Sequence, residues 1–185
     1  ETDPDLDQEP ERTWRATGSG RRAPAIAVGR IVHAAIQRSA LPGSAGYERF
    51  IENEAFRAGL VDMRQRQAAI EESSELLGRL AAHKLWGEVR AAEGAQHEIP
   101  FTTSDPQGQV QSGQIDLLWR APEGWKLVDF KSDRLRDEAE LQAAVEEHAH
   151  QVERYMRCAA SLLGEKPVGL LCFLDAVGEV RLVEV

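Results

Sequence analysis

The sequence predicts an α/β domain, a sheet flanked by helices with a helical insertion before the strands. Three observations support this fold. The 185 residues suit one domain with a sizeable core. Apolar residues recur at helical spacing through most of the first half, and short apolar runs typical of strands fill much of the second half. A long helical pattern, Glu140 to Leu163, separates the third strand-like run from the fourth.

Composition divides the chain into a tail and a domain. Residues 1–23 are acidic and then rich in Gly, Ser, Arg and Pro, which is typical of a linker or tail. Residues 24–185 are predicted to form a single domain, in which 47–92 is the helical insertion and 96–185 the core that carries the chemistry. Because the chain does not begin with Met, we expect it to be a piece of a longer protein.

The net charge of -9 does not exclude a nucleic-acid partner. Residues 1–11 hold six acidic residues and no Lys or Arg, so they contribute -6 and the remainder carries -9 minus -6, or -3. A site that stores carboxylates for a metal ion would account for part of that remainder. The two cysteines, Cys158 and Cys172, lie in apolar surroundings and are predicted to be buried thiols.

Two stretches in the first half are predicted to be helical. Residues 24–40 place Val28, Ile31 and Val32 on one apolar face, and His33 lies at the edge of that face. Residues 47–92 read as three further helices, a cap expected to shape a channel or contact a larger assembly.

Five strands are predicted in the second half. The first, 96–103, contains Pro100 and is therefore expected at a sheet edge. Residues 109–120 and 125–132 form a hairpin around a turn at 121–124. The closing strands are 168–174 and 180–185, joined by a turn at 175–178.

The hairpin carries the most distinctive residues. Asp129 and Lys131 are two apart and so share one strand face. The hairpin would place Asp116 on the neighbouring strand, about 5 Å from Asp129 if the register allows. Two like charges at that distance repel by about 3 kcal/mol at an effective dielectric of about 20. A divalent cation and Lys131 would offset that repulsion. Without metal, Asp116→Asn is expected to melt at or above the unmodified protein.

Other candidate residues have simpler explanations when each is taken alone. His33 could be a hydrogen-bonded residue at a helix border, and Glu98 a solvent-facing strand residue. Gln151 and Tyr155 are four apart on the long helix, so they share the shoulder of its buried face and could be ordinary border residues.

The ordered set of these residues resembles a known family. Asp116 followed by Asp129-Phe-Lys131 is similar to the D…D-x-K core of the PD-(D/E)XK nucleases, and Asp129 to Arg134 is similar to the C-terminal nuclease domain of RecB and AddA helicase–nucleases. Gly29 to His33, Glu98, and the Gln151–Tyr155 pair fit the same pattern. The resemblance spans about residues 28–184.

The resemblance implies a restriction-endonuclease-like core, with a central mixed sheet flanked by helices. It implies metal ligands at His33, Asp116, Asp129 and the carbonyl of Phe130, with Lys131 orienting water or stabilising charge on the phosphate. Glu98 would support the metal shell or a second ion, and Gln151 and Tyr155 would orient catalytic groups or DNA. Hard oxygen ligands favour Mg²⁺, with Mn²⁺ as a substitute.

The resemblance also implies a setting: a bacterial, cytoplasmic helicase–nuclease in recombinational repair, degrading single-stranded ends that its motor delivers. The helicase domains would belong to the same full-length chain, and a second subunit is possible. Two cysteines cannot hold the four-cysteine iron–sulfur cluster of some relatives, and no phosphate-loop motif for ATP and no membrane span are visible. The alternatives are an inactive nuclease-fold module that binds DNA or partners, and a stand-alone nuclease.

Overall fold

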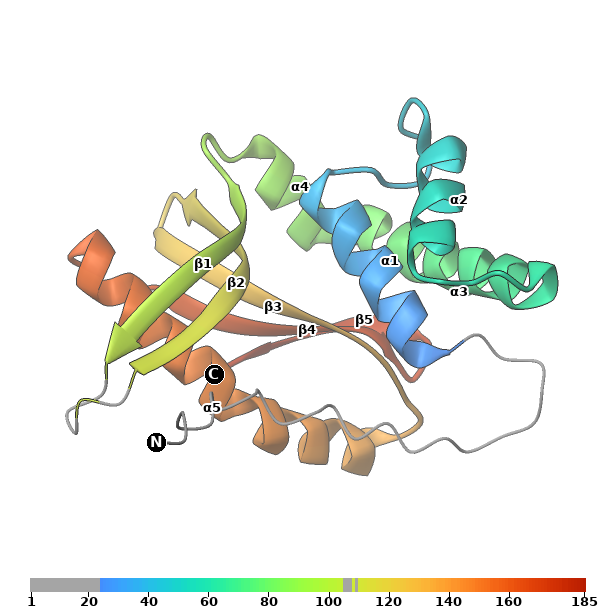
Figure 1. The fold of residues 1–185 in the computed structure, drawn as a ribbon. Coiled ribbons are helices and arrows are strands. Elements are labelled where there is room, and N and C mark those ends of the chain that lie inside the picture. Colours follow the sequence, from blue (N-terminus) through green and yellow to red (C-terminus); the bar gives the residue numbers. More distant parts are fainter. Residues whose placement is uncertain (1–23, 105–107, 109) are drawn as a thin grey trace, which may run out of the picture.

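The computed structural model describes residues 24–104, 108 and 110–185. The predicted tail, 1–23, lies outside these residues. One five-stranded sheet crosses the molecule, with four helices on one face and a single long helix on the other (Figure 1). The α/β class and the flanked sheet are confirmed.

The sheet is mixed because one of its connections is a helical crossover. Its strands are β1 (Gln96–Ser104), β2 (Val110–Ala121), β3 (Gly124–Leu135), β4 (Val168–Ala176) and β5 (Glu179–Glu184), and they lie in that order. The pairs β1–β2, β2–β3 and β4–β5 are antiparallel. Helix α5 (Glu138–Leu163) links β3 to β4, which are parallel. Strand β1 lies at the edge, as Pro100 predicts.

The helical layer is built from α1 (Ala25–Gln37), α2 (Tyr47–Arg57), α3 (Met63–Ala82) and α4 (Lys84–Ala91). The predicted first helix, 24–40, extends three residues too far at its C-terminal end, because Ser39 has a φ of +51° that a right-handed helix cannot continue through. The predicted helical stretch 47–92 is confirmed as three helices.

Alternating residues of the sheet supply two separate cores. Trp119, Val128 and Phe130 pack against the α1–α4 layer. Leu127 and Phe173 face α5. The helical layer therefore shares a core with the sheet, which supports the proposal that residues 24–185 form one domain.

The sheet opens near its middle. Pairing between β2 and β3 runs from Ala121–Gly124 to Leu117–Val128, and β2 residues before Leu117 pair with β1 alone. Strand β2 also changes face at this point, since Leu117 packs on the helical layer whereas Ile115 packs on the α5 side. Two strands that separate leave main-chain groups without ladder partners, and polar side chains can occupy the opening.

Two predicted boundaries are corrected by local hydrogen bonding. Helix α5 begins at Glu138 rather than Glu140, since the Asp137 carboxylate caps it by accepting from the Glu140 amide at 2.9 Å. The last turn is shorter than predicted, because Ala176 pairs with Glu179.

Both cysteines are free and buried, as predicted. Within the described part of the chain, no helix has the length and apolarity needed to cross a bilayer.

Candidate active site

The opening in the sheet brings two carboxylates together from β1 and β2. The pairs His97–Leu117 and Ile99–Ile115 flank Glu98 and Asp116, so the register sets these two residues opposite each other. Glu98 has a φ of +51°, an unusual backbone conformation for a non-glycine residue that changes where its side chain points.

Asp116 is tied to the other side of the opening. Its Oδ2 accepts a hydrogen bond from the Phe130 amide at 2.7 Å. That amide lies just beyond the last β2–β3 pair, so the Asp116 carboxylate replaces a ladder partner. This hydrogen bond fixes the Asp116 carboxylate between β2 and β3, where the two strands stop pairing.

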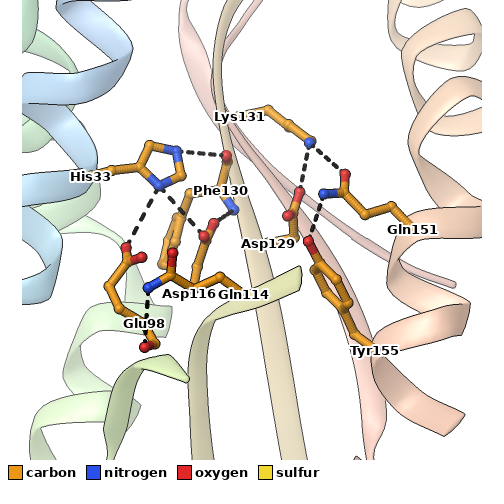
Figure 2. Close-up of polar contacts among 9 residues, drawn as sticks. All are labelled: His33, Glu98, Gln114, Asp116, Asp129, Phe130, Lys131, Gln151 and Tyr155. Atoms are coloured by element: carbon orange, nitrogen blue, oxygen red, sulfur yellow. Dashed lines mark hydrogen bonds and ion pairs between the residues drawn. The ribbon is translucent and has the colours of Figure 1, made fainter. Parts of the chain in front are cut away.

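His33 reaches this pair of carboxylates from α1. Its Nδ1 lies 3.5 Å from Asp116 Oδ1 and 4.0 Å from Glu98 Oε1, and its Nε2 lies 3.2 Å from the carbonyl oxygen of Phe130 (Figure 2). A carbonyl can only accept, so Nε2 carries a proton. Nδ1 then presents either a lone pair or a second proton to the carboxylates. Either a bound cation or that proton would relieve their repulsion.

Three pKa changes reflect this crowding of acids. Burial lowers the pKa of His33, but the charges of Asp116, Asp129 and Glu98 and a hydrogen bond to Asp116 outweigh it, so the pKa is raised above 6.5. Burial and the Asp116 charge raise the pKa of Glu98, although His33 opposes the rise.

For Asp116, burial would raise the pKa, but His33, the Phe130 amide and Lys131 together hold it below 3.8.

A second group of polar residues faces α5. The Lys131 ammonium lies 2.9 Å from Asp129 Oδ2 and donates to Gln151 Oε1 at 3.0 Å. Gln151 in turn donates from Nε2 to the Tyr155 hydroxyl at 2.6 Å. Phe101 contacts the Tyr155 ring edge-on, with ring centroids 5.4 Å apart. Asp129, Lys131 and Tyr155 are each at most 5% exposed, so this network is held rigidly.

The Asp129 carboxylate carries the electrostatic strain of the site. Burial and the neighbouring Asp116 charge raise its pKa to about 6, against the opposing effects of Lys131 and His33. The expectation that Asp116→Asn melts at or above the unmodified protein stays a prediction, but the contacts of Asp116 argue against it. Asp116 has a main-chain partner and a depressed pKa, and the strained carboxylate is its neighbour.

Both groups border one cavity of about 360 Å³. Its lining includes His33, Glu98, Asp116, Asp129 and Gln151. A second cavity of about 350 Å³ lies beyond Lys131 and also touches His33.

Comparison with known proteins identifies the family. A model of the PD-(D/E)XK nuclease superfamily matches residues 9–181. The chain belongs to this superfamily.

Two known proteins are similar to this PD-(D/E)XK domain, one in sequence and one in fold. It is 31% identical over 177 residues to a chain of the ATP-dependent helicase/nuclease of Heliobacterium modesticaldum, an alignment that covers 85% of this chain and 12% of that protein. The chain thus spans about an eighth of this relative's length. A crystal structure from Eubacterium rectale named "Putative exonuclease" has a TM-score of 0.57 at 14% identity, covering 93% of this chain and 61% of that one, which supports the fold.

The PD-(D/E)XK domain contains a group of residues suited to a metal ion. One ligand atom each from His33, Glu98 and Asp116 lie within 4.8 Å of one another. Imidazole nitrogen and carboxylate oxygens are suitable donors for a divalent cation. Asp129 lies beside them across the opening but directs its carboxylate towards Lys131, and the Phe130 carbonyl contacts His33.

The structure brings all the sequence-predicted site residues of the PD-(D/E)XK domain to this opening. Sequence reasoning missed two further polar residues that line the cavity, Arg30 and Gln114, and the apolar Ile26. Arg30 could have been found, because it lies one helical turn before His33. Gln114 donates to the carbonyl of Glu98 at 3.2 Å, a contact that depends on the unusual backbone there.

Proposed function

We propose that this domain is a Mg²⁺-dependent deoxyribonuclease that hydrolyses phosphodiester bonds, with Mn²⁺ able to replace Mg²⁺. One observation carries the proposal: three ligand atoms from His33, Glu98 and Asp116 within 4.8 Å of one another, at a cavity bounded on its other side by Asp129. An acid cluster with a fixed lysine beyond it suits a phosphate better than a neutral substrate.

The residues would hold a metal in the cleft and orient the groups around it. His33, Glu98 and Asp116 would be ligands, and Asp129 would join them from across the opening. When bound, the ion supplies Lewis acidity and lowers the pKa of a water molecule at the phosphate. Lys131 would hold its ammonium against the charge that develops on the phosphate oxygens, because Asp129 and Gln151 fix its position.

We further propose that the domain is the exonuclease module of a helicase–nuclease in recombinational DNA repair in the bacterial cytoplasm. The similarity to the Heliobacterium modesticaldum helicase/nuclease supports this setting. Single-stranded ends delivered by helicase domains of the same chain would be the substrate, and a second subunit could take part.

The test is cleavage of end-labelled DNA. Linear single strands, linear duplex and circular single strands are incubated with Mg²⁺, Mn²⁺ or Zn²⁺, with EDTA as the metal-free control. The proposal expects degradation of linear single strands with Mg²⁺ or Mn²⁺, and slower loss of circles, which have no ends.

The preparation of Asp116→Asn serves as the control for contaminating nuclease. Tight DNA binding without cleavage under every metal condition would contradict the nuclease proposal and favour a binding module.

A further inference from the structure

Helix α1 presents more than His33 to the active-site cavity. Ile26, Arg30 and His33 all line it, at spacings of four and three residues. Such residues lie on one helix face, about one turn or 5.4 Å apart along the axis. Exposure changes along this face. Ile26 in the first turn is 45% exposed, Arg30 is also exposed, and His33 reaches the carboxylates.

Arg30 stands out by its lack of a counter-ion. It shares the cavity with Glu98, Asp116 and Asp129, yet among the described residues it makes no hydrogen bond or ion pair. Arg79, by contrast, is held by Asp175 at 2.7 Å. Within the part of the chain that the structure describes, Arg30 is also the one Lys or Arg in the lining of this cavity.

The other positively charged side chain near the site, Lys131, already has partners. Lys131 is 5% exposed and contacts both Asp129 and Gln151. It can act on a phosphate at the centre of the site but cannot reach out to the next one along a strand. A polyanion entering a cavity with three carboxylates needs a further positive charge nearer the mouth. A guanidinium suits that task, because it binds phosphate oxygens through two parallel hydrogen bonds.

We propose that Arg30 binds the backbone phosphate adjacent to the scissile one, with Ile26 against the sugar or base of the same nucleotide. One helical turn separates this contact from His33, so α1 forms the wall along which the substrate strand lies. Arg30 is then a positioning residue that selects a polynucleotide with at least one phosphate beyond the bond to be cut. The inference rests on the proposed function, whose substrate it specifies.

The first test is binding, which does not require cleavage. Fluorescence anisotropy in EDTA compares the unmodified protein with Arg30→Ala, Arg30→Lys and the matched control Arg38→Ala, an exposed arginine near the end of α1 outside both cavities. We expect Arg30→Ala to weaken single-strand binding roughly tenfold and to lower the slope of log affinity against log salt by about 0.7, the value for one phosphate contact. Arg30→Lys should retain part of the affinity, and Arg38→Ala all of it.

The second test locates the phosphate. One methylphosphonate, a neutral linkage, is moved along a single-stranded oligonucleotide, and the cut sites are mapped with Mg²⁺. In the unmodified protein the neutral linkage next to the cut should raise KM roughly tenfold and change kcat little. In Arg30→Ala the same methylphosphonate should not raise KM further, because the guanidinium that would contact that phosphate is already absent.

The outcomes separate the two claims. Equal affinities and salt slopes for Arg30→Ala and Arg38→Ala would overturn the inference. A methylphosphonate that raises KM by the same factor in Arg30→Ala as in the unmodified protein would also overturn it. Failure of the unmodified protein to cut any DNA would contradict the proposed function instead, while the anisotropy comparison would still decide whether Arg30 contacts a phosphate. Matching thermal melts of the four proteins confirm that each is folded.

Discussion

The two sides of the candidate active site differ in how their charged groups are paired. On the α1 side, His33, Glu98 and Asp116 gather three ligand atoms around a cavity, with no Lys or Arg bound to them among the described residues. On the α5 side, the buried Lys131 contacts the half-buried Gln151, which in turn contacts the buried Tyr155.

The difference suggests that one side binds the metal ion and the other holds a fixed geometry. A cluster left short of positive charge can take up and release an ion, so its occupancy can vary. A buried chain in which each polar group has a partner holds one geometry whether or not an ion is present. We therefore expect changes on the α1 side to alter metal binding and changes on the α5 side to alter turnover.

The largest expected effect is at Lys131. Replacing it by alanine removes the ammonium that would face the phosphate in the proposed reaction, and it leaves Asp129 without its ion pair. We predict a fall in kcat of about 10²–10³-fold or more, the usual cost of losing one preorganised electrostatic group. The control is Lys126→Ala on the same strand, whose partners Glu123 and Glu88 lie at the surface. Similar rates for the two variants would remove Lys131 from the mechanism.

Metal binding should separate the two sides. Mg²⁺ at a hundredfold excess over its dissociation constant should stabilise the unmodified protein by about 2.7 kcal/mol. We predict that Glu98→Gln and Asp116→Asn lose most of this gain whereas Gln151→Ala keeps it. Thermal melting in EDTA and in a Mg²⁺ series measures the shifts. Equal shifts in all four proteins would show that the ion binds elsewhere.

Stability without metal should depend on pH with opposite signs at the two aspartates. The pKa of Asp129 is raised to about 6, so its stabilising contribution is present below about pH 4 and is lost as the pH rises to about 6. The pKa of Asp116 is lowered, so its contribution is present above 3.8 and is lost as the pH falls through the folded value.

At pH 8 in EDTA, Asp129→Asn should therefore be more stable than the unmodified protein, by on the order of 2 kcal/mol, and Asp116→Asn less stable than it. Melts repeated from pH 8 to pH 4 should show the advantage of Asp129→Asn disappear. An Asp129→Asn variant that is less stable at every pH would show that Lys131 needs the full charge of its partner.

The smallest expected effect is at Gln151. Its loss frees the Lys131 ammonium and the Tyr155 hydroxyl from their shared partner. We predict a tenfold fall in kcat for Gln151→Ala, about 1.4 kcal/mol of transition-state stabilisation, and a smaller fall for Tyr155→Phe. Gln142→Ala, at an exposed position on the same helix, is the control. Unchanged kinetics for both Gln151→Ala and Tyr155→Phe would leave these residues a packing role only.

The sequence predicted the elements and the α5 side of the site well. Periodicity gave every helix and strand to within a few residues, and alternation alone put Asp129 and Lys131 on one face. The spacing of Gln151 and Tyr155 likewise predicted their shared face, which the structure shows as a hydrogen bond. These relations are local, and local geometry follows from the repeat of a strand or helix.

The α1 side could not be predicted in the same way. The contact between Asp116 and the Phe130 amide depends on where two strands stop pairing, and no local pattern sets that point. The positive φ of Glu98 has no marker in its residue type, because such a backbone normally favours Gly, Asn or Asp. The sign of the charge effect at Asp116 depends on these non-local contacts, so spacing along the sequence alone cannot give it.

Asp116 holds the fold as well as the site, and this has a consequence for evolution. A lineage that lost nuclease activity would be free to replace Glu98, whose carboxylate accepts no hydrogen bond from the described residues. Position 116 would remain under selection, because the Phe130 amide still needs an acceptor where the strands part. Inactive descendants should therefore keep Asp or change to Asn at 116 while varying freely at 98. Position 98 would then be the better marker of catalysis among relatives, and position 116 a marker of the open sheet.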